Sequence, residues 1–216
     1  MSASLDSPPV HIPMKPRRHI IKNTLLAFAT PIQQVRFEGM DQFNAELARR
    51  VLAMRDATPT EHFSNLGGWH SNSDFLHNLG SPYAGQLADM FVQGIAAALE
   101  SLVEITEVPH MHPRVESWAN VNERGDSNGL HIHPGNPWSG VYYVATEKNA
   151  GGEIYFVDPR IASLMSIHPL NPFNATNPIV ITPEAGTLLV FPSFLYHGVH
   201  PYQGNTPRIS IAFNLM

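Results

Sequence analysis

Apolar positions in the first half of the chain recur at helical spacing in two stretches. The first covers about residues 41–56, with Asp41 as its expected cap, and the second covers about residues 82–104. Residues three and four positions apart share one face of a helix, so each stretch would present an apolar stripe. Ser81 before Pro82 is a typical helix start, with the hydroxyl as the cap. We therefore predict two amphipathic helices that pack against another layer.

The pattern changes near residue 115 to the alternation that is typical of strands. Apolar and polar residues alternate over residues 115–122, and side chains two positions apart share one face of a sheet. Further strands are predicted at residues 138–145, 153–157, 179–182, 187–191 and 208–214. Helices followed by strands that Gly, Pro and Asn turns separate favour a mainly β fold, a sandwich or jelly roll with the helices packed outside.

The domain organisation expected from this pattern is simple. Residues 1–18 contain four prolines and no periodic pattern, so we predict a flexible or extended N-terminal arm. Residues 19–216 are expected to form a single domain, because β folds of this length often form one unit. The segment 64–71, SNLGGWHS, is predicted to be a polar, glycine-rich loop.

Composition limits the partners and the metal chemistry. The formal net charge is −5, and the 13 Lys and Arg residues are spread along the chain, which gives no support for a nucleic-acid partner. The chain has no membrane-length apolar run and no signal peptide, so we expect a cytoplasmic protein, for which a homodimer is the commonest assembly. Because there is no Cys, any metal must be held by His and carboxylate groups.

Two histidine clusters supply candidate metal ligands. His131 and His133 are two residues apart, so on a strand they would reach one ion from the same face. A third ligand is expected from the segment 191–201, where His197 follows a predicted strand in a loop. His200, beside Pro201, is the alternative to His197. Three protein ligands on one face of an iron ion leave the remaining positions for a co-substrate and O2.

A candidate anion site follows on the last predicted strand. An Arg side chain binds carboxylates through two parallel hydrogen bonds, so Arg208, with Ser210 on the same face to add a third, would suit a dicarboxylate co-substrate. An ion pair on the sheet surface is the competing interpretation. Tyr142 and Tyr143 face opposite sides of their strand, so one of them can offer its hydroxyl to the interior.

Several motifs in this order resemble the iron(II)- and 2-oxoglutarate-dependent dioxygenases over about residues 115–216. They are His131-x-His133, Gly151–Phe156, Pro183–Pro192, His197, Gly204 and Arg208-x-Ser210. The segments SNLGGWHS, SGVYYV, VDPR and FPSFLYHGVHP further resemble a bacterial and phage subgroup of 2-oxoglutarate-Fe(II) oxygenases with an H-x-H motif. The resemblance implies a double-stranded β-helix, a cupin-like jelly roll, with iron in its mouth.

The resemblance also implies roles for individual residues. His131 would be the first iron ligand and His197 the distal histidine. Arg208 and Ser210 would bind the far carboxylate of 2-oxoglutarate, and Tyr143 would assist them. The implied cofactors are Fe(II) and 2-oxoglutarate, and the implied partners are O2 and a small-molecule or peptide substrate. The family's reaction hydroxylates a C–H bond and releases CO2 and succinate.

The departure from the family lies at His133, where most members have a carboxylate. Three arrangements are compatible with the sequence: three histidines, two histidines with a water, or a carboxylate recruited from Asp126 or Glu123. We rank them in this order, because only His133 shares the strand face of His131.

Four further residues are candidates for the surroundings of the site. Asn120 and Asn122 are suited to orienting the ligands, and Trp118 and Trp138 to forming a substrate wall. Two other functions remain as alternatives: a cupin-like three-His dioxygenase without 2-oxoglutarate, and a non-catalytic metal-binding jelly roll. Arg208-x-Ser210 downstream of His197 favours the 2-oxoglutarate-dependent enzyme over both.

Overall fold

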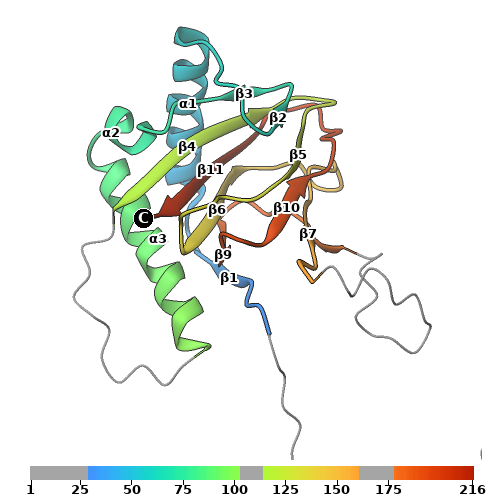
Figure 1. The fold of residues 1–216 in the computed structure, drawn as a ribbon. Helices are drawn as coiled ribbons and strands as arrows, with labels where there is room; N and C mark the ends of the chain where they lie inside the picture. The colour runs from blue at the N-terminus through green and yellow to red at the C-terminus, as the bar shows by residue number, and fades with distance from the viewer. Residues whose placement is uncertain (1–28, 103–113, 161–177) are drawn as a thin grey trace, which may run out of the picture.

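Two antiparallel sheets lie face to face, and helices cover the outer side of one of them (Figure 1). The computed structural model describes residues 29–102, 114–160 and 178–216. The N-terminal arm expected at residues 1–18 therefore lies outside the described residues. None of the helices in the described part of the chain is long and apolar enough to cross a membrane.

The six-stranded sheet has the order β1-β9-β6-β11-β4-β3. Its strands are β1 (Gln33–Arg36), β3 (Trp69–His70), β4 (Val115–Asn122), β6 (Trp138–Ala145), β9 (Thr187–Pro192) and β11 (Arg208–Leu215). The five-stranded sheet has the order β2-β5-β10-β7-β8. Its strands are β2 (Asn65–Leu66), β5 (Ser127–His131), β7 (Ile154–Val157), β8 (Ile179–Ile181) and β10 (Tyr196–Val199).

The predicted mainly β fold with flanking helices is confirmed. Every strand predicted from residue 115 onward is present, with its ends shifted by at most one residue. Segment 64–71, which was expected to be a loop, contributes the short strands β2 and β3 instead. They pair with β5 and β4, so this segment joins both sheets.

Three helices pack on the six-stranded sheet: α1 (Asp41–Ala57), α2 (Phe75–Leu79) and α3 (Tyr83–Glu100) (Figure 1). The predicted caps of α1 and α3 are wrong. Asp41 lies inside α1, and no side chain caps the N-terminus of either helix. Ser81 precedes a cis bond to Pro82, and α3 begins at Tyr83. Helix α2 was not predicted, because one turn and a half is too short to show a helical period.

Strand β11 shows how alternation divides the molecule into two interiors. Its apolar side chains Ile209, Ile211 and Phe213 are buried in the core between the sheet and the helices. The intervening residues Arg208, Ser210, Ala212 and Asn214 line a cavity between the two sheets. The same strand therefore stabilises the fold with one face and builds the candidate site with the other.

Two glycines of α3 test how closely this helix packs on the sheet. A Cβ at Gly94 would meet Leu188 Cδ2 at 2.5 Å and Val190 Cγ2 at 2.9 Å, whereas a Cβ at Gly85 would meet nothing within 4 Å. Forcing an extra methyl group into a packed core lowers the free energy of unfolding by roughly 1–3 kcal/mol. Replacing Gly by Ala inside a helix raises it by about 1 kcal/mol, because Ala has the higher helix propensity. We expect Gly94→Ala to lower the free energy of unfolding by about 1 kcal/mol and Gly85→Ala to raise it. Urea denaturation checks both, and equal shifts in the same direction would contradict this packing.

Candidate metal centre and anion-binding cavity

The two sheets enclose a cavity of about 650 Å³, lined by residues of both. One wall consists of the polar faces of β4 and β11, and the opposite wall consists of β5, β10 and the chain that follows β5. Pockets that bind small molecules enclose roughly 300–1,000 Å³. The cavity is therefore large enough for more than one small ligand.

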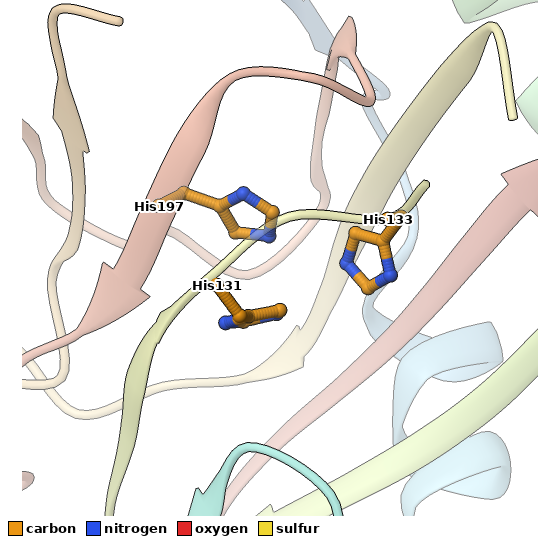
Figure 2. Close-up of side chains that lie close together, drawn as sticks. All are labelled: His131, His133 and His197. Carbon is orange, nitrogen blue, oxygen red and sulfur yellow. The ribbon is translucent and has the colours of Figure 1, made fainter. Parts of the chain in front are cut away.

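Three histidines meet on one wall of this cavity: His131, His133 and His197. One potential ligand atom of each lies within 4.8 Å of the others, and Figure 2 shows the three rings grouped together. The ring centroids are 5.0 Å apart for His131 and His133, 4.3 Å for His131 and His197, and 5.2 Å for His133 and His197. These three side chains could hold one metal ion.

Strand register brings His131 and His197 together although 65 residues separate them in the sequence. His131, at the end of β5, is the direct partner of His197 on β10. His133 follows the end of β5, and its backbone N–H donates to the carbonyl of Ser193 at 3.0 Å. The prediction that His197 lies in a loop is wrong, since it is the second residue of β10. A strand position fixes the side-chain direction more rigidly than a loop would.

Backbone carbonyls orient two of the three rings. His131 Nδ1 lies 2.8 Å from the carbonyl of Gly129, and His197 Nδ1 lies 2.8 Å from the carbonyl of Leu195. With Nδ1 as the donor to a carbonyl, Nε2 keeps its lone pair for a metal, and this is how histidines that ligate metals are usually held.

Burial keeps the imidazoles uncharged. It lowers the pKa of His197 to about 3 and that of His133 to about 4, with His131 adding to both shifts. Burial also lowers the pKa of His131. A neutral imidazole is the form that binds a metal ion, so all three are in the ligating form near pH 7.

The alternative ligands lie elsewhere. His200 stacks on Tyr155 with 4.5 Å between ring centroids and does not belong to the histidine group. Asp126 Oδ2 accepts a hydrogen bond from the backbone N–H of Glu123 at 2.7 Å. Glu123 Oε1 accepts from Arg55 at 3.3 Å, and Asp126 and Glu123 both line a second, separate hollow. Neither carboxylate joins the three histidines among the described residues.

Arg208 is a buried cation at one end of the cavity. Its side chain is 2% exposed, and its Nη1 donates to Asn122 Oδ1 at 3.0 Å and to Ser210 Oγ at 3.4 Å. Burial lowers its pKa. No carboxylate of the described residues forms an ion pair with it, so the predicted competing role in a surface ion pair does not apply there.

Two buried atoms at this end lack hydrogen-bond partners. Among the described residues these are the hydroxyl of Tyr143 and Nε of Arg208. The guanidinium carbon of Arg208 lies 5.2 Å from the centre of the Tyr143 ring. Tyr143 faces the cavity, while the Tyr142 hydroxyl faces the helices and donates to Asn44 at 2.7 Å. Burial raises the pKa of Tyr143 to about 12, so its hydroxyl stays protonated and able to donate.

The structure gives the remaining predicted residues different surroundings. Asn122 contacts Arg208, whereas Asn120 lines the cavity beside it. Trp118 also lines the cavity and lies against His133, with 5.5 Å between ring centroids. Trp138 packs against the core under the helices and is absent from the cavity lining, so the predicted substrate wall includes only Trp118 of the two.

Several cavity residues were not predicted from the sequence, among them Ser64, His70 and Glu116. Ser64 Oγ lies 3.5 Å from His131 Nε2, and His70 stacks on Trp118 at 5.7 Å. Glu116 lines the end of the cavity that lies opposite Arg208. The first two lie in the SNLGGWHS segment, which was predicted only to be a polar, glycine-rich loop, a type of segment that often carries function. The alternation of β4 placed Glu116 on the same face as Trp118, which was the available signal.

The arrangement fits a metal ion together with an anion that carries a carboxylate. Three neutral nitrogen ligands suit a first-row transition metal and leave room for further ligands. A buried guanidinium and a protonated phenol, both with unused donors, suit a carboxylate. Gly152, with φ +71°, makes room for this cation, because a Cβ there would lie 2.8 Å from Arg208 Cδ.

Comparison with protein families links this site to a known class. Residues 116–214 match the family described as "Putative 2OG-Fe(II) oxygenase". The matched range contains all three histidines, Arg208, Ser210 and Tyr143. None of the curated proteins matches the chain by sequence.

Solved structures share the fold at low sequence identity. A Pseudomonas putida prolyl-4-hydroxylase is 17% identical, with a TM-score of 0.56, over 85% of this chain and 91% of its own. A Trichoplax adhaerens prolyl hydroxylase, solved with a hypoxia inducible factor peptide, is 12% identical, with a TM-score of 0.54, over 86% and 83%. The α-ketoglutarate-dependent epimerase SnoN from nogalamycin biosynthesis is 16% identical, with a TM-score of 0.58, over 86% and 78%. The predicted double-stranded β-helix is therefore confirmed.

Proposed function

We propose that this protein is a 2OG-Fe(II)-dependent hydroxylase whose Fe(II) is held by His131, His133 and His197, because residues 116–214 match the family described as "Putative 2OG-Fe(II) oxygenase". In this proposal 2-oxoglutarate binds at the Arg208 end of the cavity. Two of the structural relatives are prolyl hydroxylases and one is an epimerase, so hydroxylation is the part that needs a direct test. The fold alone does not select the reaction.

The observation that carries the proposal is the unpaired cation in the cavity that also contains the histidines. Leaving a charge buried without a partner costs several kcal/mol. A bound carboxylate would supply that partner and would also accept hydrogen bonds from the unused Nε of Arg208 and the Tyr143 hydroxyl. Asn122 and Ser210 hold the guanidinium in place by accepting from Nη1.

The remaining residues provide the conditions that oxidative chemistry needs. When bound, Fe(II) and 2-oxoglutarate supply the oxidising power: one atom of O2 enters a substrate C–H bond, the other enters succinate, and the keto acid leaves as succinate and CO2. Val141, Ile154 and Phe191 give part of the cavity an apolar lining, which would disfavour water beside the reacting groups. The carbonyls of Gly129 and Leu195 keep two imidazoles oriented toward one point.

Tyr143→Phe separates co-substrate binding from folding. Because the hydroxyl has no partner in the cavity, its removal should leave the free energy of unfolding unchanged or raise it by up to about 1 kcal/mol. The same change should weaken 2-oxoglutarate binding by roughly 10- to 150-fold, the value of one hydrogen bond to a charged acceptor. Calorimetric titration and thermal unfolding of the two proteins check this. A Tyr143→Phe protein that binds 2-oxoglutarate as tightly as the parent would remove Tyr143 from the co-substrate site.

The test of the proposed function is the fate of labelled 2-oxoglutarate. The protein is incubated in air with Fe(II), labelled 2-oxoglutarate and excess ascorbate, which reduces the oxidised centre when no substrate is present, and labelled succinate is quantified against Arg208→Ala. We expect succinate from the parent and none above background from the variant. Absence of succinate from both, under conditions where the metal is bound, would contradict the proposal.

A second candidate is favoured by the absence of a carboxylate among the three potential ligands. Three neutral imidazoles leave the metal centre one unit more positive than the usual two-His, one-carboxylate set. A three-His dioxygenase that binds its organic substrate directly would consume O2 without making succinate. Measuring both O2 and succinate in the same reaction distinguishes the two functions.

A further inference from the structure

The cavity has two polar ends on the same sheet. Strands β4 and β11 are paired so that Arg208 lies opposite Asn122 at one end, and Asn214 lies opposite Glu116 at the other. The two ends are six residues apart along each strand, or about 20 Å at the usual rise. 2-Oxoglutarate is too short a diacid to span both, so a ligand at the Glu116 end must be a different molecule.

Side-chain hydrogen bonds build the second end. Ser139 Oγ donates to Asn214 Oδ1 at 2.8 Å, and Asn214 Nδ2 donates to Glu116 Oε2 at 3.5 Å. The hydroxyls of Ser139 and Ser193 are 2.7 Å apart. Ser139, Ser193 and Asn214 are all buried. The acceptor role of Asn214 Oδ1 fixes its amide orientation, so its NH2 group is directed at the Glu116 carboxylate.

Glu116 brings a negative charge to this end. It is the one carboxylate among the described residues that line the cavity, and it is half-buried. None of the ion pairs formed by the described residues involves it. A half-buried carboxylate that accepts one weak hydrogen bond retains most of its capacity for a cationic donor.

A row of rings leads from the surface to the histidine cluster. Phe63, which is 75% exposed, lies 5.1 Å from His70. His70 stacks on Trp118 at 5.7 Å, and Trp118 lies 5.5 Å from His133. Trp118 is also two residues from Glu116 on β4, a rise of about 7 Å. The row forms an aromatic wall between the mouth, the histidines and the carboxylate, and its Phe63 and Trp118 rings provide apolar surface.

We propose that the Glu116 end selects the substrate to be oxidised, through a protonated amine or guanidinium carried on an apolar chain. The proposal rests on the proposed function, because 2-oxoglutarate is assigned to the Arg208 end. Glu116 pairs with the cationic group, and Trp118 packs against the apolar chain. Since Trp118 lies between Glu116 and His133, the carbon that faces the metal site is several bonds from the charged nitrogen. Glu116 is thus a specificity-determining residue.

The experiment compares matched cationic and neutral probes by anaerobic calorimetry. The Fe(II)-loaded protein is saturated with 2-oxoglutarate and titrated with pentylamine, butylguanidine and 1-pentanol. We expect the two cations to bind at least about tenfold more tightly than the alcohol, the value of one charge-assisted hydrogen bond. Glu116→Gln should abolish this preference, and Glu116→Asp should retain part of it. Glu123→Gln is the matched control, because this exposed carboxylate lies outside the cavity, and it should bind like the parent.

Three results of these titrations would contradict the proposal, and two further measurements accompany them. Cations that bind no better than 1-pentanol to the parent, absence of binding, or a preference that survives Glu116→Gln would overturn the proposal. The 2-oxoglutarate titration that precedes each run tests the proposed function separately, and Glu116→Gln should leave its dissociation constant unchanged. The affinities of lysine amide and of the peptide Gly-Gly-Lys-Gly-Gly are then compared. The probe that binds more tightly shows whether the cation belongs to a small amine or to a peptide side chain.

Discussion

Arg208→Ala is expected to weaken 2-oxoglutarate binding by roughly 30- to 5,000-fold, which corresponds to the loss of about 2–5 kcal/mol for a buried charge partner. The reason is that Arg208 is the buried cation of this cavity, and its Nε has no partner among the described residues. Metal binding should be unchanged, because the three histidines come from the opposite wall. Anaerobic titration with Fe(II), followed by 2-oxoglutarate, measures both constants on one sample.

Two controls distinguish a loss of 2-oxoglutarate binding in Arg208→Ala from a loss of folding stability. Arg36→Ala removes an exposed arginine that pairs with Glu184, and it should bind 2-oxoglutarate like the parent. Removing an unpaired buried charge should not lower the melting temperature of the ligand-free Arg208→Ala protein by more than a few degrees. If Arg208→Ala binds 2-oxoglutarate as tightly as Arg36→Ala, Arg208 has no role in co-substrate recognition.

His197→Ala is expected to lower the affinity for Fe(II) by more than about 100-fold, since changes to residues that merely orient a ligand already cost about 10- to 100-fold. His197 is buried, and its Nδ1 is held by the carbonyl of Leu195. His200→Ala is the matched control on the same segment, because His200 stacks on Tyr155 away from the cluster. Equilibrium dialysis with metal analysis measures both variants.

The opposite result would change the assignment of the third ligand. The contradicting result is that His200→Ala loses the metal while His197→Ala keeps it. In that case β10 would pair with β5 and β7 in a different register from the one in this structure. Thermal unfolding without metal should be recorded for both, because His197 fills buried space and His200 does not.

Local alternation made much of the fold predictable. Six of the eight described strands from residue 115 onward, all except β5 and β10, could be placed to within one residue, because each has one face toward the helices or the other sheet and this fixes its pattern. The same alternation indicated that Tyr142 and Tyr143 face opposite sides, and the structure has one on each side of the sheet. It also placed His131 and His133 close together.

Features that depend on pairing between distant segments were harder to predict. His197 lies on a strand of four residues whose partners are β5 and β7, and so short a strand has no pattern of its own. Segment 64–71 forms two-residue strands that exist only through their pairing with β5 and β4. The position of Trp138 in the core under the helices similarly follows from its pairing with Leu215 rather than from its own neighbours.

The sequence also left the charge balance of the site open. It supplied Asp126 and Glu123 as nearby carboxylates, and only the structure shows that both line a different hollow. The hydroxyl of Tyr143 and Nε of Arg208, which are buried without partners, are likewise properties of the packed state. A sequence pattern can place residues on a face, but it cannot show which donors remain unused.

The most direct test of the metal and co-substrate site is a crystal structure of the protein grown anaerobically with Fe(II) and 2-oxoglutarate, with anomalous scattering recorded at the iron edge. We predict one iron peak bonded to nitrogen atoms of His131, His133 and His197, and 2-oxoglutarate with its far carboxylate on Arg208 and Tyr143. An iron peak that lacks any one of these three histidines, or a co-substrate that makes no contact with Arg208, would contradict this account.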